Sequence, residues 1–241
     1  MGTVPRGDYL FSHPAIRLLG LLILLSGGAP VRAASLPDPF PAGCITARTL
    51  PNGLRVVVRE DHSLPIISMV VAVRGGSGVE GPAGAAHFLE HLVLQGTKKY
   101  PGHLAPQYEL ERVGGVSSAV TSRDMTRFQA TVDSSQAGLL VDVLADVALA
   151  AALDDERFAR ERPTVLSEIQ QLGDDPQAVL VNLGYEHSFR AHPYRRRPTG
   201  SINDVLALTA DDIRSYCQRW YVPNNMSVVL VGDVTLRGHR L

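Results

Sequence analysis

Strand-forming and helix-forming segments occur in groups along this chain, and the grouping narrows its fold more than any other pattern. Two pairs of strand-like segments and two isolated ones are separated by runs of helical segments. One-by-one alternation would indicate a doubly wound parallel sheet, whereas grouped elements favour an α+β fold. The sequence therefore predicts an antiparallel sheet covered by helices.

Local patterns set the expected elements. Asn52-Gly53 tolerates the positive φ of a tight turn and predicts a hairpin. The β-branched run 66–73 predicts a buried strand. The expected strands are 46–50, 54–60, 66–73, 116–121, 126–132 and 227–231. The expected helices are 83–95, 105–113, 136–151, one from 155 to about 172, and one after the capping-box pattern 209–212 that ends near 220.

Residues 1–33 have the layout of a secretory signal peptide. Arg6 and Arg17 precede the apolar run 18–25, and Ala33 offers a small residue before a cut. Eight apolar residues fall well short of the roughly 20 that a spanning helix needs. We therefore expect export to the periplasm or extracellular space, with no stable membrane span after cleavage.

The rest of the chain divides into a Pro-rich lead-in, 34–43, and one domain, 44–241. Hydrophobic residues make up 45% of the 241-residue chain, which is enough for a packed core. The formal net charge of −1 gives no basis for a nucleic-acid partner.

The segment His87-Phe88-Leu89-Glu90-His91 carries the clearest chemical signal. Imidazoles four residues apart lie on one face of a helix and can bind one metal ion, and Glu90 lies near enough to take a proton from water. This is the HExxH motif in inverted order. Chance occurrence on a surface helix is the alternative, but the apolar neighbours bury the helix partly, which disfavours unpaired polar groups.

A catalytic zinc commonly has three protein ligands and one open position. Glu161 and Glu168 are seven positions apart on one expected helix, so both can face the same way, and either can be the third ligand. The alternative for each is a solvated charge among the acidic and basic residues that begin this helix.

These residues resemble the pitrilysin/insulinase-type zinc peptidases, which include the β subunit of the mitochondrial processing peptidase. The likeness covers nearly all of the mature chain. It rests on the segments 84–91, 96–101, 114–126, 161–168, 192–194 and 221–233.

The resemblance implies a role for each site residue. It assigns one zinc ion per chain to His87, His91 and Glu168, and the general-base role to Glu90. Glu161 would orient or tune the site. The other histidines lack ligand spacing and are expected to be surface or packing residues: His13, His62, His103, His187, His192 and His239.

Three features depart from the family pattern. Arg195-Arg196-Arg197 follows His192-Pro193-Tyr194, where the family usually has Gly, and we expect this basic run to be a solvated face. Ser118-Ala119 stands where the family usually has Asn-Ala on its substrate-binding strand, which we expect to be an edge strand to which a peptide adds. We also expect this chain to lack the second half that encloses substrate in family members. We therefore expect a zinc peptidase domain that hydrolyses unstructured peptides and pairs with a second-half chain or homologous subunit. The alternative is a truncated or non-catalytic partner of a second peptidase-like chain.

Overall fold

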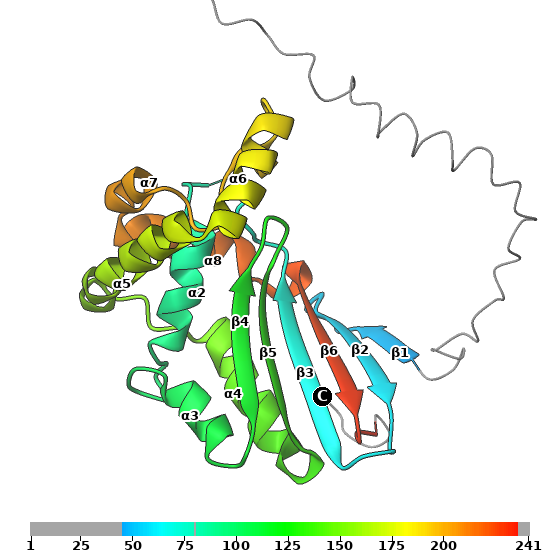
Figure 1. Ribbon diagram of the computed structural model, residues 1–241. Coiled ribbons are helices and arrows are strands. Elements are labelled where there is room, and N and C mark those ends of the chain that lie inside the picture. The colour runs from blue at the N-terminus through cyan, green and yellow to red at the C-terminus, as the bar shows by residue number, and fades with distance from the viewer. Residues whose placement is uncertain (1–44, 80, 236–241) are drawn as a thin grey trace, which may run out of the picture. The chain divides into compact units, whose positions relative to one another are not determined.

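A six-stranded sheet forms the centre of the computed structural model, which describes residues 45–79 and 81–235 (Figure 1). The predicted signal peptide, 1–33, and lead-in, 34–43, lie outside the described residues. The strands are β1 (Ile45–Thr49), β2 (Arg55–Glu60), β3 (Ile66–Val73), β4 (Val116–Thr121), β5 (Thr126–Asp133) and β6 (Met226–Gly232). All six were predicted, with small differences at their ends.

The strand order is β1-β2-β6-β3-β5-β4, which places β4 at an edge as predicted. Four of the neighbouring pairs are antiparallel, and β2 with β6 is parallel. The α+β prediction is confirmed, but a purely antiparallel sheet was wrong at this pair. The last strand inserts between β2 and β3, which run in opposite directions, so it must be parallel to one of them.

The described residues form seven helices. They are α2 (Ala85–Leu94), α3 (Ala105–Glu111), α4 (Ala137–Leu149), α5 (Asp155–Asp174), α6 (Pro176–Ser188), α7 (Ile202–Ala207) and α8 (Ala210–Trp220). Five were predicted, and the capping box at the start of α8 is present between Thr209 and Asp212. None in the described part of the chain is long and apolar enough to cross a membrane.

Helices α6 and α7 were not predicted. The apolar residues of α6 are spread around the helix and form no stripe on one face, so its sequence gives little indication of a helix, and none of its residues is buried. Helix α7 does carry a signal, because Ser201 and Asp204 form a capping box that the sequence spells out.

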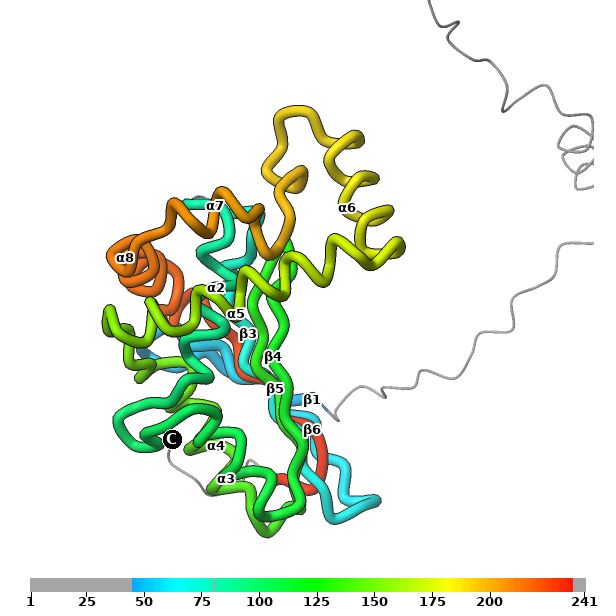
Figure 2. Tube along the Cα trace, turned by 60° about the vertical axis from the view of Figure 1, so that its left-hand side comes forward, coloured from blue at the N-terminus to red at the C-terminus, as the bar shows by residue number. Residues whose placement is uncertain are grey.

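The core lies between one face of the sheet and the helices. Alternate residues of β3 are buried against α4, and α2 contacts α5, α8 and β4 (Figures 1 and 2). Phe88 of α2 packs on Phe158 of α5, with 4.6 Å between ring centroids. Eight residues of the ten-residue helix α2 are buried, so its polar side chains are drawn into the interior.

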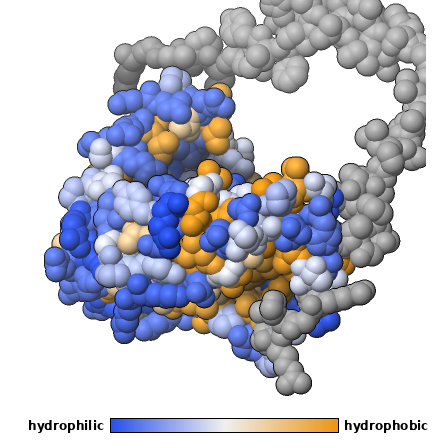
Figure 3. All heavy atoms as spheres, turned by 90° about the horizontal axis from the view of Figure 1, so that it is seen from below, coloured by the Kyte–Doolittle hydropathy of each residue, from blue (hydrophilic) through white to orange (hydrophobic). Residues whose placement is uncertain are grey.

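Apolar side chains also remain at the surface. Seen from below, an apolar area lies between hydrophilic regions (Figure 3). On the edge strand β4, Val116 is 68% exposed and Val120 is 41% exposed. An edge strand with exposed apolar residues is suited to be covered by another chain segment.

Candidate metal centre

Helix α2 is fixed at its start by a close backbone approach. Gly84, the residue before the helix, has φ of 83°, and a Cβ atom there would lie 2.9 Å from the backbone oxygen of Thr199. A side chain would therefore be both strained and crowded. This packing sets the position of α2, and with it His87, Glu90 and His91 along one side.

Helix α5 brings Glu168 to the two histidines. His87 Nε2 lies 3.4 Å from Glu168 Oε1, and His91 Nε2 lies 3.0 Å from Glu168 Oε2. One nitrogen or oxygen of each side chain lies within 4.8 Å of the others. Of the two glutamates that the sequence left open as third ligand, Glu168 is the one that faces both imidazoles.

The three side chains fit a zinc ion. Tetrahedral zinc with bonds near 2.0–2.1 Å places its ligand atoms about 3.3 Å apart. The two nitrogen–oxygen distances above run to different oxygens of Glu168 and are close to that spacing, and the three ligand atoms as a set lie within 4.8 Å of one another. Two imidazoles and one carboxylate are also a common donor set for a catalytic zinc, with a fourth position left for water.

The electrostatics favour a cation between these groups. Burial opposes the charge on His91, but the carboxylates of Glu161 and Glu168 outweigh it and raise its pKa to about 9. Hydrogen bonds to His87 and His91 hold the pKa of Glu168 well below its usual value. The negative charge of Glu161 and Glu168 therefore stabilises a positive charge at this position. A divalent metal ion can supply that positive charge.

Glu90 is buried beside this cluster, with 8% of its surface exposed. Its Oε2 accepts a hydrogen bond of 2.5 Å from the hydroxyl of Thr121, at the end of β4. Thr121 also lies 3.1 Å from the hydroxyl of Thr126 on the neighbouring strand. The sequence predicted a role for Glu90 but none for Thr121, because the pairing of a helix with a strand end is a tertiary contact.

Glu161 is 4% exposed and contacts His91 from the side opposite Glu168. Its Oε1 lies 2.9 Å from His91 Nδ1, while Glu168 faces Nε2. A carboxylate on Nδ1 sets the tautomer in which Nε2 is free to bind a metal.

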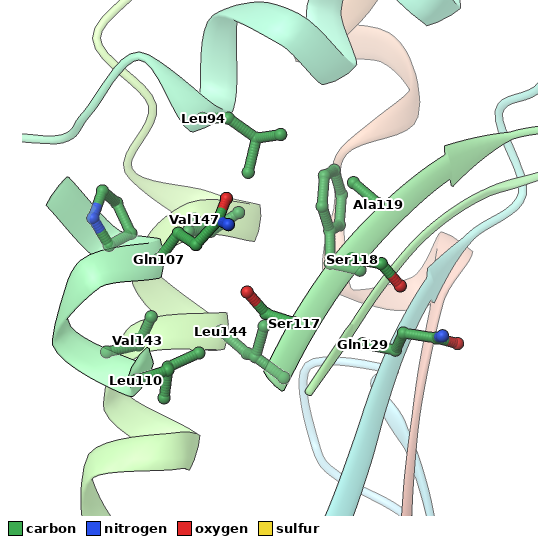
Figure 4. A pocket seen from close by; sticks show the side chains of 12 residues that line it. Leu94, Gln107, Leu110, Ser117, Ser118, Ala119, Gln129, Val143, Leu144 and Val147 are labelled. Carbon is green, nitrogen blue, oxygen red and sulfur yellow. The ribbon is translucent and has the colours of Figure 1, made fainter. Parts of the chain in front are cut away.

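Ser118 and Ala119 lie on β4, two or three residues from Thr121. They line a narrow pocket of about 30 Å³ between β4 and helices α2, α3 and α4 (Figure 4). Leu94, one turn beyond His91, lines the same pocket. The other residues that line the pocket are Pro106, Gln107, Leu110, Ser117, Phe128, Gln129, Val143, Leu144 and Val147.

Comparison with known proteins agrees with this geometry. Residues 55–200 match the family described as Insulinase (Peptidase family M16), and residues 207–238 match the Peptidase M16 inactive domain. This chain belongs to peptidase family M16, as its resemblance implied.

The relatives are zinc proteases and processing peptidases. The chain is 38% identical over 190 residues to an uncharacterized zinc protease of Mycobacterium leprae, covering 77% of this chain and 42% of that protein. It is 32% identical over 188 residues to a probable mitochondrial-processing peptidase subunit beta of Arabidopsis thaliana, covering 77% of this chain and 35% of that protein. The chain thus spans less than half the length of either relative.

Solved structures share the fold. A protease from Helicobacter pylori superposes with a TM-score of 0.75 at 31% identity, over 80% of this chain and 47% of that one. The first half of the periplasmic protease PqqL from Escherichia coli gives a TM-score of 0.72 at 26% identity, over 81% and 44%.

Proposed function

We propose that this chain is the catalytic half of a zinc-dependent endopeptidase that hydrolyses unstructured peptides, with one zinc ion per chain. The convergence of His87, His91 and Glu168 beside the buried Glu90 carries the proposal. The zinc protease names of its relatives support it. A complete ligand set and base favour catalysis over the alternative role of a non-catalytic partner.

Metal binding and proton transfer fall to different side chains of the site. His87, His91 and Glu168 would hold the ion, which when bound supplies a Lewis acid and lowers the pKa of a water molecule toward about 7. Glu90 takes the proton of the attacking water and passes it to the leaving amine. The Thr121 hydroxyl holds the Glu90 carboxylate in place for that transfer.

The edge strand β4 is the proposed binding site for the peptide backbone. A substrate added as a further strand would gain main-chain hydrogen bonds that are tolerant of sequence. Ser118 and Ala119 would face it, and the narrow pocket beside them would admit one small apolar side chain near the scissile bond. Ser118 offers a shorter side chain and fewer donors than the family's usual asparagine.

A second-half chain, or a homologous subunit, is the proposed partner. Its support is that M16 relatives are more than twice as long as the matched region, and that this chain covers 44% of the solved first half of PqqL and 23% of the longer PqqL structure. Contacts on both sides of the scissile bond position the substrate, and their loss costs several kcal/mol of catalysis.

We also propose that the protein is exported. The support is the Arg17 and apolar-run layout of residues 1–33, together with the description of PqqL as a periplasmic protease. Intact-mass analysis of protein recovered outside the cytoplasm should give an amino terminus at Ala34. A mature protein that retains residues 1–33 would contradict this.

Metal removal tests the activity itself. Protein dialysed against a chelator should lose hydrolysis of unfolded peptides, and one equivalent of zinc should restore it. The assay is run with the chain alone and with an added second-half chain, since we expect the pair to be far more active. Full activity in chelator-treated, metal-free protein would refute the proposed chemistry.

A further inference from the structure

A line of hydrogen bonds runs from the metal-facing histidine to the protein surface. Glu161 accepts from Gln95 Nε2 through the oxygen that does not face His91. The other end of the same amide, Gln95 Oε1, lies 2.9 Å from His103 Nδ1. Gln95 is 7% exposed and Glu161 is 4% exposed, whereas His103 is at the surface.

The chemistry of the groups gives this line one direction. Gln95 donates to a carboxylate through its NH₂ group, so its oxygen can only accept, and His103 must donate from Nδ1–H. Glu161, fixed by that donor, accepts from His91 Nδ1–H. Glu161 thereby fixes the orientation of the His91 ring, with Nε2 directed toward Glu168 and available as the ligand atom when a metal ion is bound.

The loop after α2 holds His103 where its Nδ1–H can donate to Gln95 Oε1. Gly96, with φ of 109°, ends the helical segment and lets the chain turn back, and it pairs with Pro101 across the loop. The backbone N–H of Leu104 then donates to Leu94, 3.0 Å away. His103 is thereby returned to Gln95, eight positions earlier.

Leu104 carries backbone strain at this point. Its φ is 57°, the one positive value for a non-glycine residue within 45–79 and 81–235. The left-handed region is unfavourable for a leucine, so this conformation persists only where surrounding contacts impose it. The strained residue directly follows His103 and is the N-cap residue that precedes α3.

We propose that Gln95 and His103 are positioning residues for the metal centre. They hold Glu161 so that it orients His91 toward the ion, and they couple the centre to the 96–104 loop. This inference rests on the proposed zinc site and goes beyond it, because neither residue touches the ligand atoms.

Zinc affinity in the folded full-length chain tests the inference. Gln95→Leu should weaken zinc binding on the order of 10-fold, as loss of outer partners of a metal ligand does. His103→Ala should weaken it roughly 2- to 10-fold, by removing one hydrogen bond to a buried group. His103→Asn retains a donor near the Nδ1 position and should restore most of the affinity. His187→Ala, at an exposed histidine of α6, is the matched control and should bind as the unaltered protein does.

A spectroscopic readout separates positioning from folding. Cobalt-substituted Gln95→Leu and His103→Ala should show shifted visible absorption bands, while His103→Asn should not, at equal folded fraction by circular dichroism. Because His103 is exposed, its variants should fold even if Gln95→Leu does not. Unchanged affinity and spectrum in His103→Ala, or an equal loss in His187→Ala, would overturn the inference. Failure of the unaltered protein to bind zinc would instead refute the proposed function, and the inference with it.

Discussion

Within residues 45–79 and 81–235, histidine–carboxylate contacts occur in two regions, which differ in burial and in the number of groups that converge. At the α2–α5 cluster, His91 lies 2.9 Å and 3.0 Å from two glutamates. Near the ends of β2 and β6, His62 lies 2.6 Å from Asp233, which also accepts from Ser134 at 2.8 Å. The shorter contact belongs to the exposed pair.

Convergence and burial distinguish the first region as the candidate metal site. Two imidazoles share Glu168, and a second carboxylate orients one of them from behind. His62 has one ring nitrogen on Asp233, while the other is 3.7 Å from Glu60, and both partners are exposed to solvent. Water screens such a pair, so it is a surface ion pair and not a ligand set.

The largest expected effect is the loss of zinc when a ligand of the α2–α5 cluster is replaced. His87→Ala, His91→Ala and Glu168→Gln should each abolish stoichiometric zinc binding, because each removes one of three ligands. Metal content of purified protein by mass spectrometry measures this. His62→Ala is the matched control and should retain one zinc per chain. Full zinc content in Glu168→Gln would remove that residue from the ligand set.

Glu90 should separate binding from chemistry within the first region. Glu90→Gln should retain zinc and lose hydrolysis by at least about 100-fold, because the amide cannot take a proton. Turnover is measured with unfolded peptide in the presence of the second-half chain. Loss of zinc together with activity would mean that Glu90 is a ligand and not the base.

A smaller loss is expected from Thr121, which touches Glu90 alone among the site residues. Thr121→Val should lower kcat roughly 10-fold, the effect of one hydrogen bond to a charged group, with KM and zinc content unchanged. The control is Thr131→Val, which removes a hydroxyl that bonds to Ser68 elsewhere on the sheet. A change in KM with kcat unchanged would assign Thr121 to substrate binding.

Helical periodicity made most of the first region predictable. Residues spaced by three or four positions share a helix face, so His87, Glu90 and His91 were identified from one segment, and Glu161 and Glu168 from another. Spacing alone left the choice between the two glutamates open, and the family resemblance assigned the ligand role to Glu168. In the structure the crossing of α2 and α5, where Phe88 packs on Phe158, brings Glu168 to both histidines.

Contacts made through loops and sheet pairing were not predictable in the same way. His103 has no periodic relation to Gln95, and the turn that joins them depends on Gly96 and the cross-loop pairing. The parallel pairing of β2 with β6 joins the two ends of the described chain. Local propensity carries no information on such pairings.

The smallest expected effect concerns the stability of the second region. Its hydrogen bond to Asp233 raises the pKa of His62 above 6.5, and the contacts with His62 and Ser134 lower that of Asp233 below 3.8. The raised histidine stabilises the fold below pH 6.5 and loses that contribution as pH rises through its folded-state pKa. The lowered carboxylate stabilises the fold above pH 3.8 and loses its contribution as pH falls through its folded-state pKa.

The contribution of the His62–Asp233 pair to the stability of the fold is therefore greatest between pH 3.8 and pH 6.5. It is lost at alkaline pH, where His62 is uncharged. His62→Gln cannot become charged, so it should lower the thermal midpoint of unfolding by no more than about 3 °C near pH 5.5, and by nothing measurable near pH 9. Zinc content should stay at one per chain in both conditions. A difference that grew toward pH 9 would reverse the sign of the linkage, and a loss of zinc would show that the two regions are not independent.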